Sequence, residues 1–112
     1  MTWNLFIDDE RIPTDVTWGE PVFYEQFPWT VARTLEEVKE LITAFGFPDF
    51  ISFDHDLGDN EPTGKDIADW IVEQDLDGTH RIPDEFAFHV HSMNPIGKRN
   101  IKELLTRYME CR

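Results

Sequence analysis

The feature that most constrains the fold of this chain is a short apolar run that ends abruptly in polar residues. Residues 50–53 read Phe-Ile-Ser-Phe, and Asp54, His55 and Asp56 follow at once. An apolar run of this length between turn residues is typical of a strand buried on both faces, as in a parallel sheet. Open α/β sheets bind ligands just beyond the carboxyl ends of such strands, so we expect the candidate site there.

Strand and helix patterns alternate along the chain, which indicates a parallel α/β sheet. The expected strands are residues 3–7, 30–33, 50–54 and 85–92. The expected helices carry a capping signal and apolar residues at helical spacing, and they begin near residues 34, 63 and 94, with a linker over residues 75–84. The prediction is a single domain over residues 1–112, a three-layer α/β sandwich with about four parallel strands in the order 2-1-3-4.

The charge of the chain narrows the choice of partners. There are 10 Lys and Arg against 23 Asp and Glu, a formal net charge of −13. Duplex nucleic acid and an anionic membrane are therefore poor partners, and a small phosphate ligand or nucleotide would need a metal or a local cluster of donors. One cysteine, no signal pattern and no long apolar stretch favour the cytoplasm. The composition leaves the oligomeric state open.

Acidic side chains also follow the first strand. Asp8 and Asp9 are adjacent carboxylates, which repel each other unless a cation or hydrogen-bond donors hold them. Their place at the mouth of a buried strand favours a divalent cation site about as well as it favours an ordinary solvated strand end. We predict that both converge with Asp54 on one cation, and both interpretations stay open here.

Two histidines mark the last strand. A period of two residues puts His89 and His91 on one face, with His91 nearer the carboxyl edge. Such a pair suits metal ligation or acid–base work. We predict that His91 acts in catalysis with His89 as its support, and that His55 is a further acid–base candidate. The alternative is that both rings pack beneath the last helix and bond only to backbone.

Groups that suit phosphoryl oxygens cluster near two helix starts. The N-terminus of a helix offers free N–H groups to an anion, although an ordinary cap is the simpler interpretation at Thr63. Asn94 has the sequence of a cap for the last helix, and Lys98 lies in its first turns, where a cation opposes the helix dipole. The predicted phosphate-binding residues are Ser92, Asn94, Lys98 and Thr63.

Residues 12–29 are irregular and rich in aromatic side chains. Three prolines break regular structure in this stretch. Its aromatic residues are Trp18, Phe23, Tyr24, Phe27 and Trp29. We favour a lid packed over the core, with a wall of the ligand pocket as the alternative.

These motifs resemble a known family. Asp8, Asp9 and Asp54 resemble the acidic pocket of two-component receiver domains, in which such residues bind Mg²⁺ and the last accepts a phosphoryl group. The chain is truncated relative to a full receiver, because the fifth strand and its lysine are missing. The segments L-F-I-D-D-E-R-x-P, D-H-D, T-G-x-D-I-A and H-V-H-S-M-N-P are more similar to the cyclic-phosphate-processing receiver domains of bacteria and phages, over about residues 3–107.

That resemblance implies a metal-dependent phosphoesterase that hydrolyses a cyclic phosphate or a cyclic nucleotide. The metal ligands that it implies are Asp8, Asp9, Asp54 and Asp56. Mg²⁺ or Mn²⁺ suits these oxygen ligands, and Zn²⁺ is an option through His89 and His91. A phage-encoded member would work in the host cytoplasm.

Three other functions stay open. The first is a degenerate receiver that signals or binds through Asp54 and turns nothing over. The second is an acidic inhibitor that mimics nucleic acid, which the charge fits but the strand-end histidines do not require. The third is a phosphatase of the haloacid-dehalogenase type, since Asp54-His55-Asp56 resembles D-x-D, although that motif normally follows the first strand.

Overall fold

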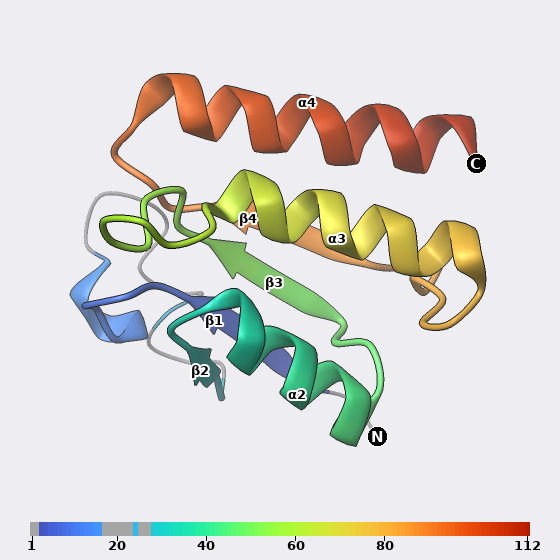
Figure 1. Cartoon of the computed structure of the whole chain (residues 1–112), viewed down its shortest axis with the longest axis horizontal. Coiled ribbons are helices and arrows are strands. Elements are labelled where there is room, and N and C mark those ends of the chain that lie inside the picture. The colour runs from blue at the N-terminus through green and yellow to red at the C-terminus, as the bar shows by residue number, and fades with distance from the viewer. Residues whose placement is uncertain (1–2, 17–23, 25–27) are drawn as a thin grey trace.

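The sheet of this domain is small and wholly parallel (Figure 1). The computed structural model describes residues 3–16, Tyr24 and residues 28–112. The strands are β1 (Asn4–Ile7), β2 (Thr30–Ala32), β3 (Phe50–Phe53) and β4 (Ala87–Val90). They form one sheet in the order β2-β1-β3-β4, and each neighbouring pair is parallel. The predicted fold class and strand order are therefore confirmed.

Three longer helices follow the strands, and a 3-10 turn, η1 (Pro13–Asp15), follows β1. They are α2 (Leu35–Phe45), α3 (Gly64–Asp77) and α4 (Pro95–Cys111). Each begins at a cap that the sequence predicts: Thr34, Thr63 and Asn94 accept backbone N–H groups of the first turn. Among the described residues, no helix combines the length and the apolar content that crossing a bilayer requires.

Helix α3 is longer than predicted, because it includes part of the expected linker. Asp75 lies inside the helix and is buried, with an exposure of 4%. Its carboxylate accepts hydrogen bonds from the backbone N–H of Ile82, the hydroxyl of Tyr108 and the guanidinium of Arg112. These contacts fasten the end of α4 to α3, far along the helices from the strand ends that carry Asp54.

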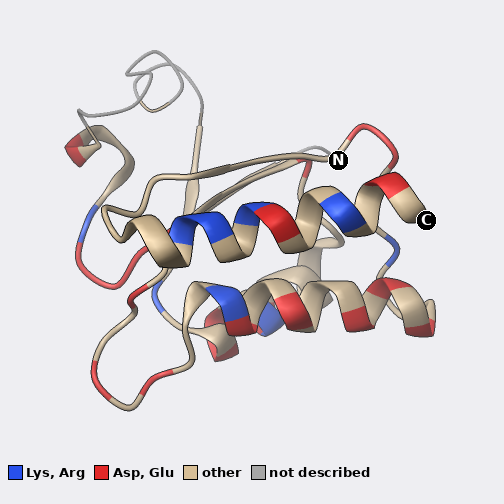
Figure 2. Ribbon diagram, turned by 90° about the horizontal axis from the view of Figure 1, so that it is seen from above, with Lys and Arg blue, Asp and Glu red and all other residues tan. Residues whose placement is uncertain are grey.

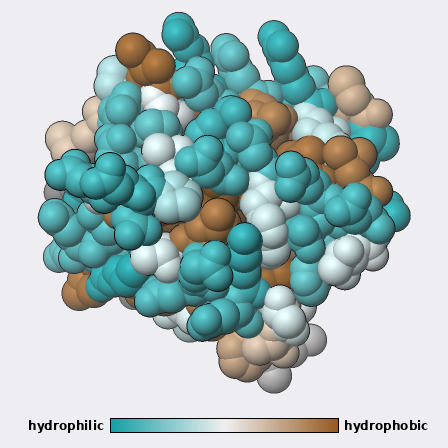
Figure 3. Space-filling model, in the orientation of Figure 1, coloured by the Kyte–Doolittle hydropathy of each residue, from teal (hydrophilic) through white to brown (hydrophobic). Residues whose placement is uncertain are grey.

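The three helices cover the same face of the sheet, and Figures 1 and 2 show them on one side of the strands. Ile42 of α2, Ile71 of α3 and Leu105 of α4 belong to one buried cluster with inward residues of the strands. Their outer surface is largely hydrophilic, with small hydrophobic patches (Figure 3). This division follows from the amphipathic spacing of each helix.

The opposite face of the sheet is covered differently. Among the described residues, Val16, Tyr24 and Trp29 pack there around Phe6 of β1. Tyr24 and Trp29 stack with ring centroids 5.6 Å apart, and the lid over residues 12–29 stays a prediction. The other aromatic residues of the predicted lid, Trp18, Phe23 and Phe27, lie outside the described residues.

The strand register positions the candidate site. The last residues of β1, β3 and β4 pair directly with one another. The next residue on each strand is Asp8, Asp54 or His91, and the backbone N–H groups of Asp54 and His91 continue the ladder to the neighbouring strand at 2.9 Å. Residues in register at strand ends share one edge of the sheet, so these three side chains meet at its carboxyl edge.

Candidate metal centre

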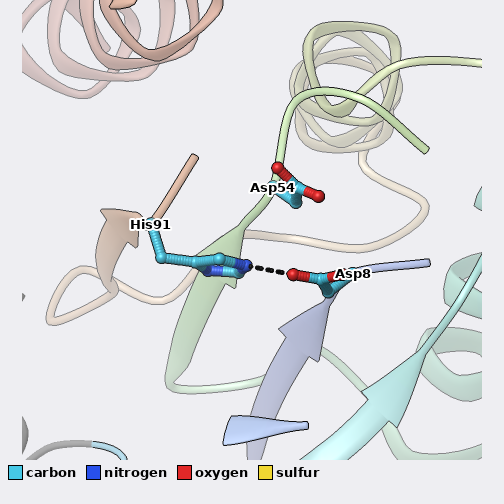
Figure 4. Close-up of side chains that lie close together, drawn as sticks. All are labelled: Asp8, Asp54 and His91. Carbon is cyan, nitrogen blue, oxygen red and sulfur yellow. Dashed lines mark hydrogen bonds and ion pairs between the residues drawn. The ribbon is translucent and has the colours of Figure 1, made fainter. Parts of the chain in front are cut away.

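Asp8, Asp54 and His91 form a compact polar cluster at the carboxyl edge of the sheet (Figure 4). Each offers a ligand atom, and these atoms lie within 4.8 Å of one another. All three residues are buried, with exposures of 1%, 6% and 1%. Buried carboxylates need a partner that offsets their charge, so the cluster is built to hold either a proton, an internal cation or a metal ion.

Asp8 is held by four hydrogen-bond donors. Its Oδ1 accepts the backbone N–H groups of Glu10 and Arg11, both at 2.9 Å. Its Oδ2 accepts Nε2 of His91 at 3.0 Å and Nη1 of Arg11 at 3.3 Å. Burial raises the pKa of Asp8, but the hydrogen bonds from His91 and from the two backbone groups outweigh it and lower the pKa to about 2. The carboxylate is therefore ionised at neutral pH, and His91 donates to it.

The pKa of Asp54 is shifted in the opposite direction to that of Asp8. Its Oδ1 accepts the backbone N–H of His55 at 2.9 Å, and no described residue donates a hydrogen bond to its Oδ2. Burial raises the pKa of Asp54, and the nearby negative charge of Asp8 raises it further. A bound cation next to both carboxylates would reverse both effects.

The donor set fits a divalent cation. Two carboxylates and one imidazole are ligands for Mg²⁺, Mn²⁺ or Zn²⁺, with oxygen preferred by the first two. The guanidinium of Arg11 already brings positive charge to Asp8, through the longest of the four contacts described above. Asp9 is not in this group of three, and its Oδ2 lies 3.8 Å from the position of a Cβ on Gly58, in the loop after β3. The metal-ligand roles of Asp9 and Asp56 stay predictions.

His91 is tied into a buried chain of hydrogen bonds. Its Nδ1 lies 2.7 Å from Oγ of Ser52, which lies 2.8 Å from the hydroxyl of Tyr24. The ring stacks on Phe6, with centroids 4.5 Å apart and planes 4° from parallel. His91 therefore faces Phe6 and Tyr24 and not the last helix, and both ring nitrogens are engaged. This geometry fixes the imidazole against Asp8.

A second histidine–carboxylate pair lies at the rim of the site. Nδ1 of His55 lies 2.9 Å from Oδ1 of Asp56, and this hydrogen bond is the main cause that lowers the pKa of Asp56. Oδ2 of Asp56 accepts Nδ2 of Asn94 at 3.3 Å. The ring of His55 packs directly on Gly97 of α4, where a Cβ would lie 2.3 Å from the ring, so only glycine allows this approach. The rim pair thus fixes the start of α4 beside Asp54.

A glycine also brings α3 against the site. A Cβ on Gly64 would lie 2.0 Å from the carbonyl oxygen of Asp54, and the N–H of Gly64 donates to the carbonyl of His55 at 2.8 Å. Both glycines let helix N-termini approach the residues that follow β3. The starts of α3 and α4 consequently lie beside the residues that follow β3.

The structure places the other predicted site residues as follows. Ser92 is buried and accepts the backbone N–H of Asn94 at 3.1 Å. Thr63 is engaged with Asp66 in the capping box of α3. His89 is half-buried, with its ring 6.3 Å from that of Tyr24, on the same face as His91. Lys98 is exposed on α4. Their roles as ligand-binding or catalytic residues stay predictions.

Four residues at the site were not singled out from the sequence: Arg11, Tyr24 as a hydrogen-bond partner, Arg33 and Ser52. The sequence contains one indication of Ser52, which is the polar residue in the otherwise apolar run of β3. No pattern in the sequence indicates Arg33. Its Nη1 donates to the backbone carbonyls of Asp8 at 2.9 Å and Arg11 at 2.6 Å, and it thereby fixes the loop after β1.

A parallel sheet with an acidic cluster at its carboxyl edge defines a receiver-like α/β domain. The family described as the cyclic-phosphate processing receiver domain matches residues 3–107, and this chain belongs to that family. The resemblance on which the sequence prediction rests is therefore confirmed. No curated protein matches the chain.

Two solved structures are similar in outline. One is the signal receiver domain of a putative Luxo repressor protein from Vibrio parahaemolyticus, with 15% identity, 99% of this chain and 92% of that chain covered, and a TM-score of 0.49. The other is a fusion chain that contains a yeast Spc42 trimeric coiled-coil segment, with 14% identity, 99% and 79% coverage, and a TM-score of 0.47.

Proposed function

We propose that this domain is a metal-dependent phosphoesterase that hydrolyses a cyclic phosphate or a cyclic nucleotide in the cytoplasm. The observation that carries the proposal is the convergence of Asp8, Asp54 and His91 at the carboxyl edge, in a chain that belongs to a family named for cyclic-phosphate processing. A cation at this cluster would also offset the protein's negative charge where an anionic substrate must approach.

Asp8 and Asp54 would hold the cation, Mg²⁺ or Mn²⁺. Zn²⁺ is an option only if Nε2 of His91 exchanges its hydrogen bond to Asp8 for the metal. When bound, the cation supplies charge neutralisation and Lewis acidity at the phosphoryl group. The chain's own part is to fix the ligands in advance. Asp8 cannot rotate while two backbone N–H groups hold its Oδ1, and His91 holds its Oδ2.

Hydrolysis of a cyclic phosphodiester also needs proton transfer. Water adds to phosphorus, one of the two ring P–O bonds breaks, and the departing oxygen takes a proton. His55 is the histidine placed for this step, because its side chain is 18% exposed and no described residue bonds to its Nε2. Asp56 orients the imidazole through Nδ1, as a carboxylate does in other acid–base pairs. His91 acts through Asp8, and His89 supports that side of the cluster.

The phosphoryl oxygens would lie between the starts of α3 and α4. Asn94 is the best placed of the predicted phosphate-binding residues, because its amide already reaches Asp56 beside His55. Ser92 adjoins it, and Thr63 and Lys98 belong to the first turns of the two helices. Backbone N–H groups at helix starts favour anions, which supports this placement.

The test is a panel of 2′,3′-cyclic nucleotides, 3′,5′-cyclic nucleotides and cyclic oligonucleotides, each incubated with Mg²⁺, Mn²⁺ or Zn²⁺ and followed by ³¹P NMR. We expect one class of substrate to be opened to a monoester, only with metal, and not by Asp54→Asn. Absence of hydrolysis across the panel would reject the proposal. Stable phosphorylation of Asp54 by acetyl phosphate, without turnover, would instead favour the signalling receiver.

A further inference from the structure

The sheet ends on one side in an open strand edge. β4 is the last strand of the order, and the backbone N–H groups of Ala87 and His91 donate to the carbonyls of Asp49, just before β3, and of Phe53, at 3.1 and 2.9 Å. Alternate residues of a strand direct their backbone groups to opposite sides, so those of Phe88 and Val90 point away from β3. Within the described part of the chain, nothing bonds to them. An unpaired row of this kind is a template for another strand.

A groove runs along this edge, between β4 and α4. Its two hollows have volumes of about 460 Å³ and about 170 Å³. The residues that define this edge groove are Phe88, Met109 and Glu110 at one end and Lys98 and Lys102 at the other. The groove is apolar in the middle and carries charges of opposite sign at its two ends.

The basic end is unusual for a chain with a net charge of −13. Lys98 and Lys102 are one helical turn apart and exposed on α4, and no described acidic residue pairs with either. Like charges at this spacing destabilise a helix slightly. Figure 2 shows the basic positions along α4, in contrast to the mainly acidic α3. Glu110, near the other end of the same helix, is exposed and also without a described ion pair.

We propose that a second copy of this chain occupies the edge groove, with the two β4 strands antiparallel about a two-fold axis. A two-fold contact requires a surface that is complementary to itself. Antiparallel pairing meets this requirement, because it brings the basic end of each groove to the acidic end of the other. Lys98 of one copy would then lie opposite Glu110 of the next.

The same pairing satisfies the backbone of the open edge. Phe88 and Val90 of each copy would exchange N–H and C=O bonds with the same residues of the other, which joins the two sheets into one. Helix α4 would then lie beside its counterpart, and Met109 would be covered. The proposal is independent of the proposed function, although β4 also carries His91 and the pairing would brace that side of the site.

The test is the mass of the protein in solution, measured by light scattering over a range of concentrations at about 0.15 M salt, where surface charges more than roughly 8 Å apart are screened. We expect wild type to approach twice its 13.2 kDa. Lys98→Glu and Glu110→Lys should each weaken dimerisation by about tenfold or more, because each places like charges opposite one another. The double variant Lys98→Glu/Glu110→Lys should restore it.

Arg99→Glu is the matched control, since Arg99 is exposed on the same helix but does not line the edge groove. It should leave the dimer unchanged, and circular dichroism should show all variants folded. A monomer at every concentration, growth beyond a dimer, or equal weakening by Arg99→Glu would overturn the proposal. So would failure of the double variant to recover.

Discussion

Two histidine–carboxylate pairs lie within the same site and differ in almost everything except their geometry. His91 and Asp8 are joined over 3.0 Å, and His55 and Asp56 over 2.9 Å. The side chains of the first pair are 0% and 1% exposed, and those of the second pair are 18% and 67% exposed. The same type of histidine–carboxylate contact therefore occurs once in a buried position and once at a position that water can reach.

The two pairs also differ at the second nitrogen of each ring. In the buried pair, the second ring nitrogen is engaged by Ser52, and the ring is stacked on Phe6. In the rim pair, no described residue engages Nε2 of His55. We therefore propose that the buried pair holds Asp8 in place and that the rim pair moves a proton.

The largest expected effect is on turnover at the rim. His55→Gln should lower the rate of hydrolysis by roughly 10²–10⁴-fold, the usual contribution of general acid–base catalysis. Because the ring also packs on Gly97, the rate should be compared on protein that circular dichroism shows to be folded. His80→Gln, at a histidine near Trp70 and away from the site, is the control. An unchanged rate in folded His55→Gln would remove the role assigned to the rim pair.

A substitution in the buried pair should lower the free energy of unfolding. His91→Ala removes a buried, stacked ring and its hydrogen bonds to Ser52 and Asp8, so we expect a loss of about 3 kcal/mol in the free energy of unfolding. Urea denaturation measures this loss. If the variant kept its stability and lost only its rate, His91 would be the catalytic histidine that the sequence predicts, and the comparison of the two pairs would fail.

A smaller effect is expected from the carboxylate of the buried pair. The pKa of Asp8 is lowered from 3.8 to about 2. A lowered pKa gives stability that is present above the unfolded value and lost as pH falls through the folded value, so Asp8→Asn should cost about 2 kcal/mol at pH 7.

The difference from wild type should shrink as pH falls from about 4 to about 2, a window set by the two pKa values of Asp8. Urea denaturation at a series of pH values measures it. Asp56→Asn at the rim is the counterpart and should cost little, because an exposed carboxylate is screened by water. Equal losses in the two variants would contradict the distinction drawn here.

The smallest effect has the opposite sign. Burial and the charge of Asp8 raise the pKa of Asp54, so its contribution to stability is full below the unfolded value and lost as pH rises through the folded value. Without metal, Asp54→Asn should therefore be more stable than wild type at pH 7. Added Mn²⁺ should raise the melting temperature of wild type and not of the variant. A metal-free variant less stable than wild type would contradict this.

Much of the fold could be predicted from the sequence, because helix caps and apolar runs mark where its helices and strands lie. The capping residues Thr34, Thr63 and Asn94 begin helices, and the apolar run before Asp54 is a central strand. Asp75 was the exception, since an acidic residue near Gly78 indicates a linker by composition. Its burial depends on Tyr108 and Arg112, which lie more than thirty residues away.

Only the part of the site that directly follows the strand ends could be predicted from the sequence. The convergence of Asp8, Asp54 and His91 follows from a parallel register, in which chain order and alternation suffice. The geometry of the loop after β1 could not be predicted, because it depends on Arg33, which follows β2 and donates to the carbonyls of Asp8 and Arg11. Such contacts between distant segments leave no periodic pattern in a sequence.

The central claim is that the carboxyl edge of this sheet is a cation site built from Asp8 and Asp54. Isothermal titration of metal-free protein with Mn²⁺ tests it most directly, with Asp54→Asn as the variant and Asp77→Asn, at the far end of α3, as the control. We predict one binding event in wild type and in Asp77→Asn, with an affinity at least about tenfold lower in Asp54→Asn. Equal affinity in wild type and Asp54→Asn would contradict the account.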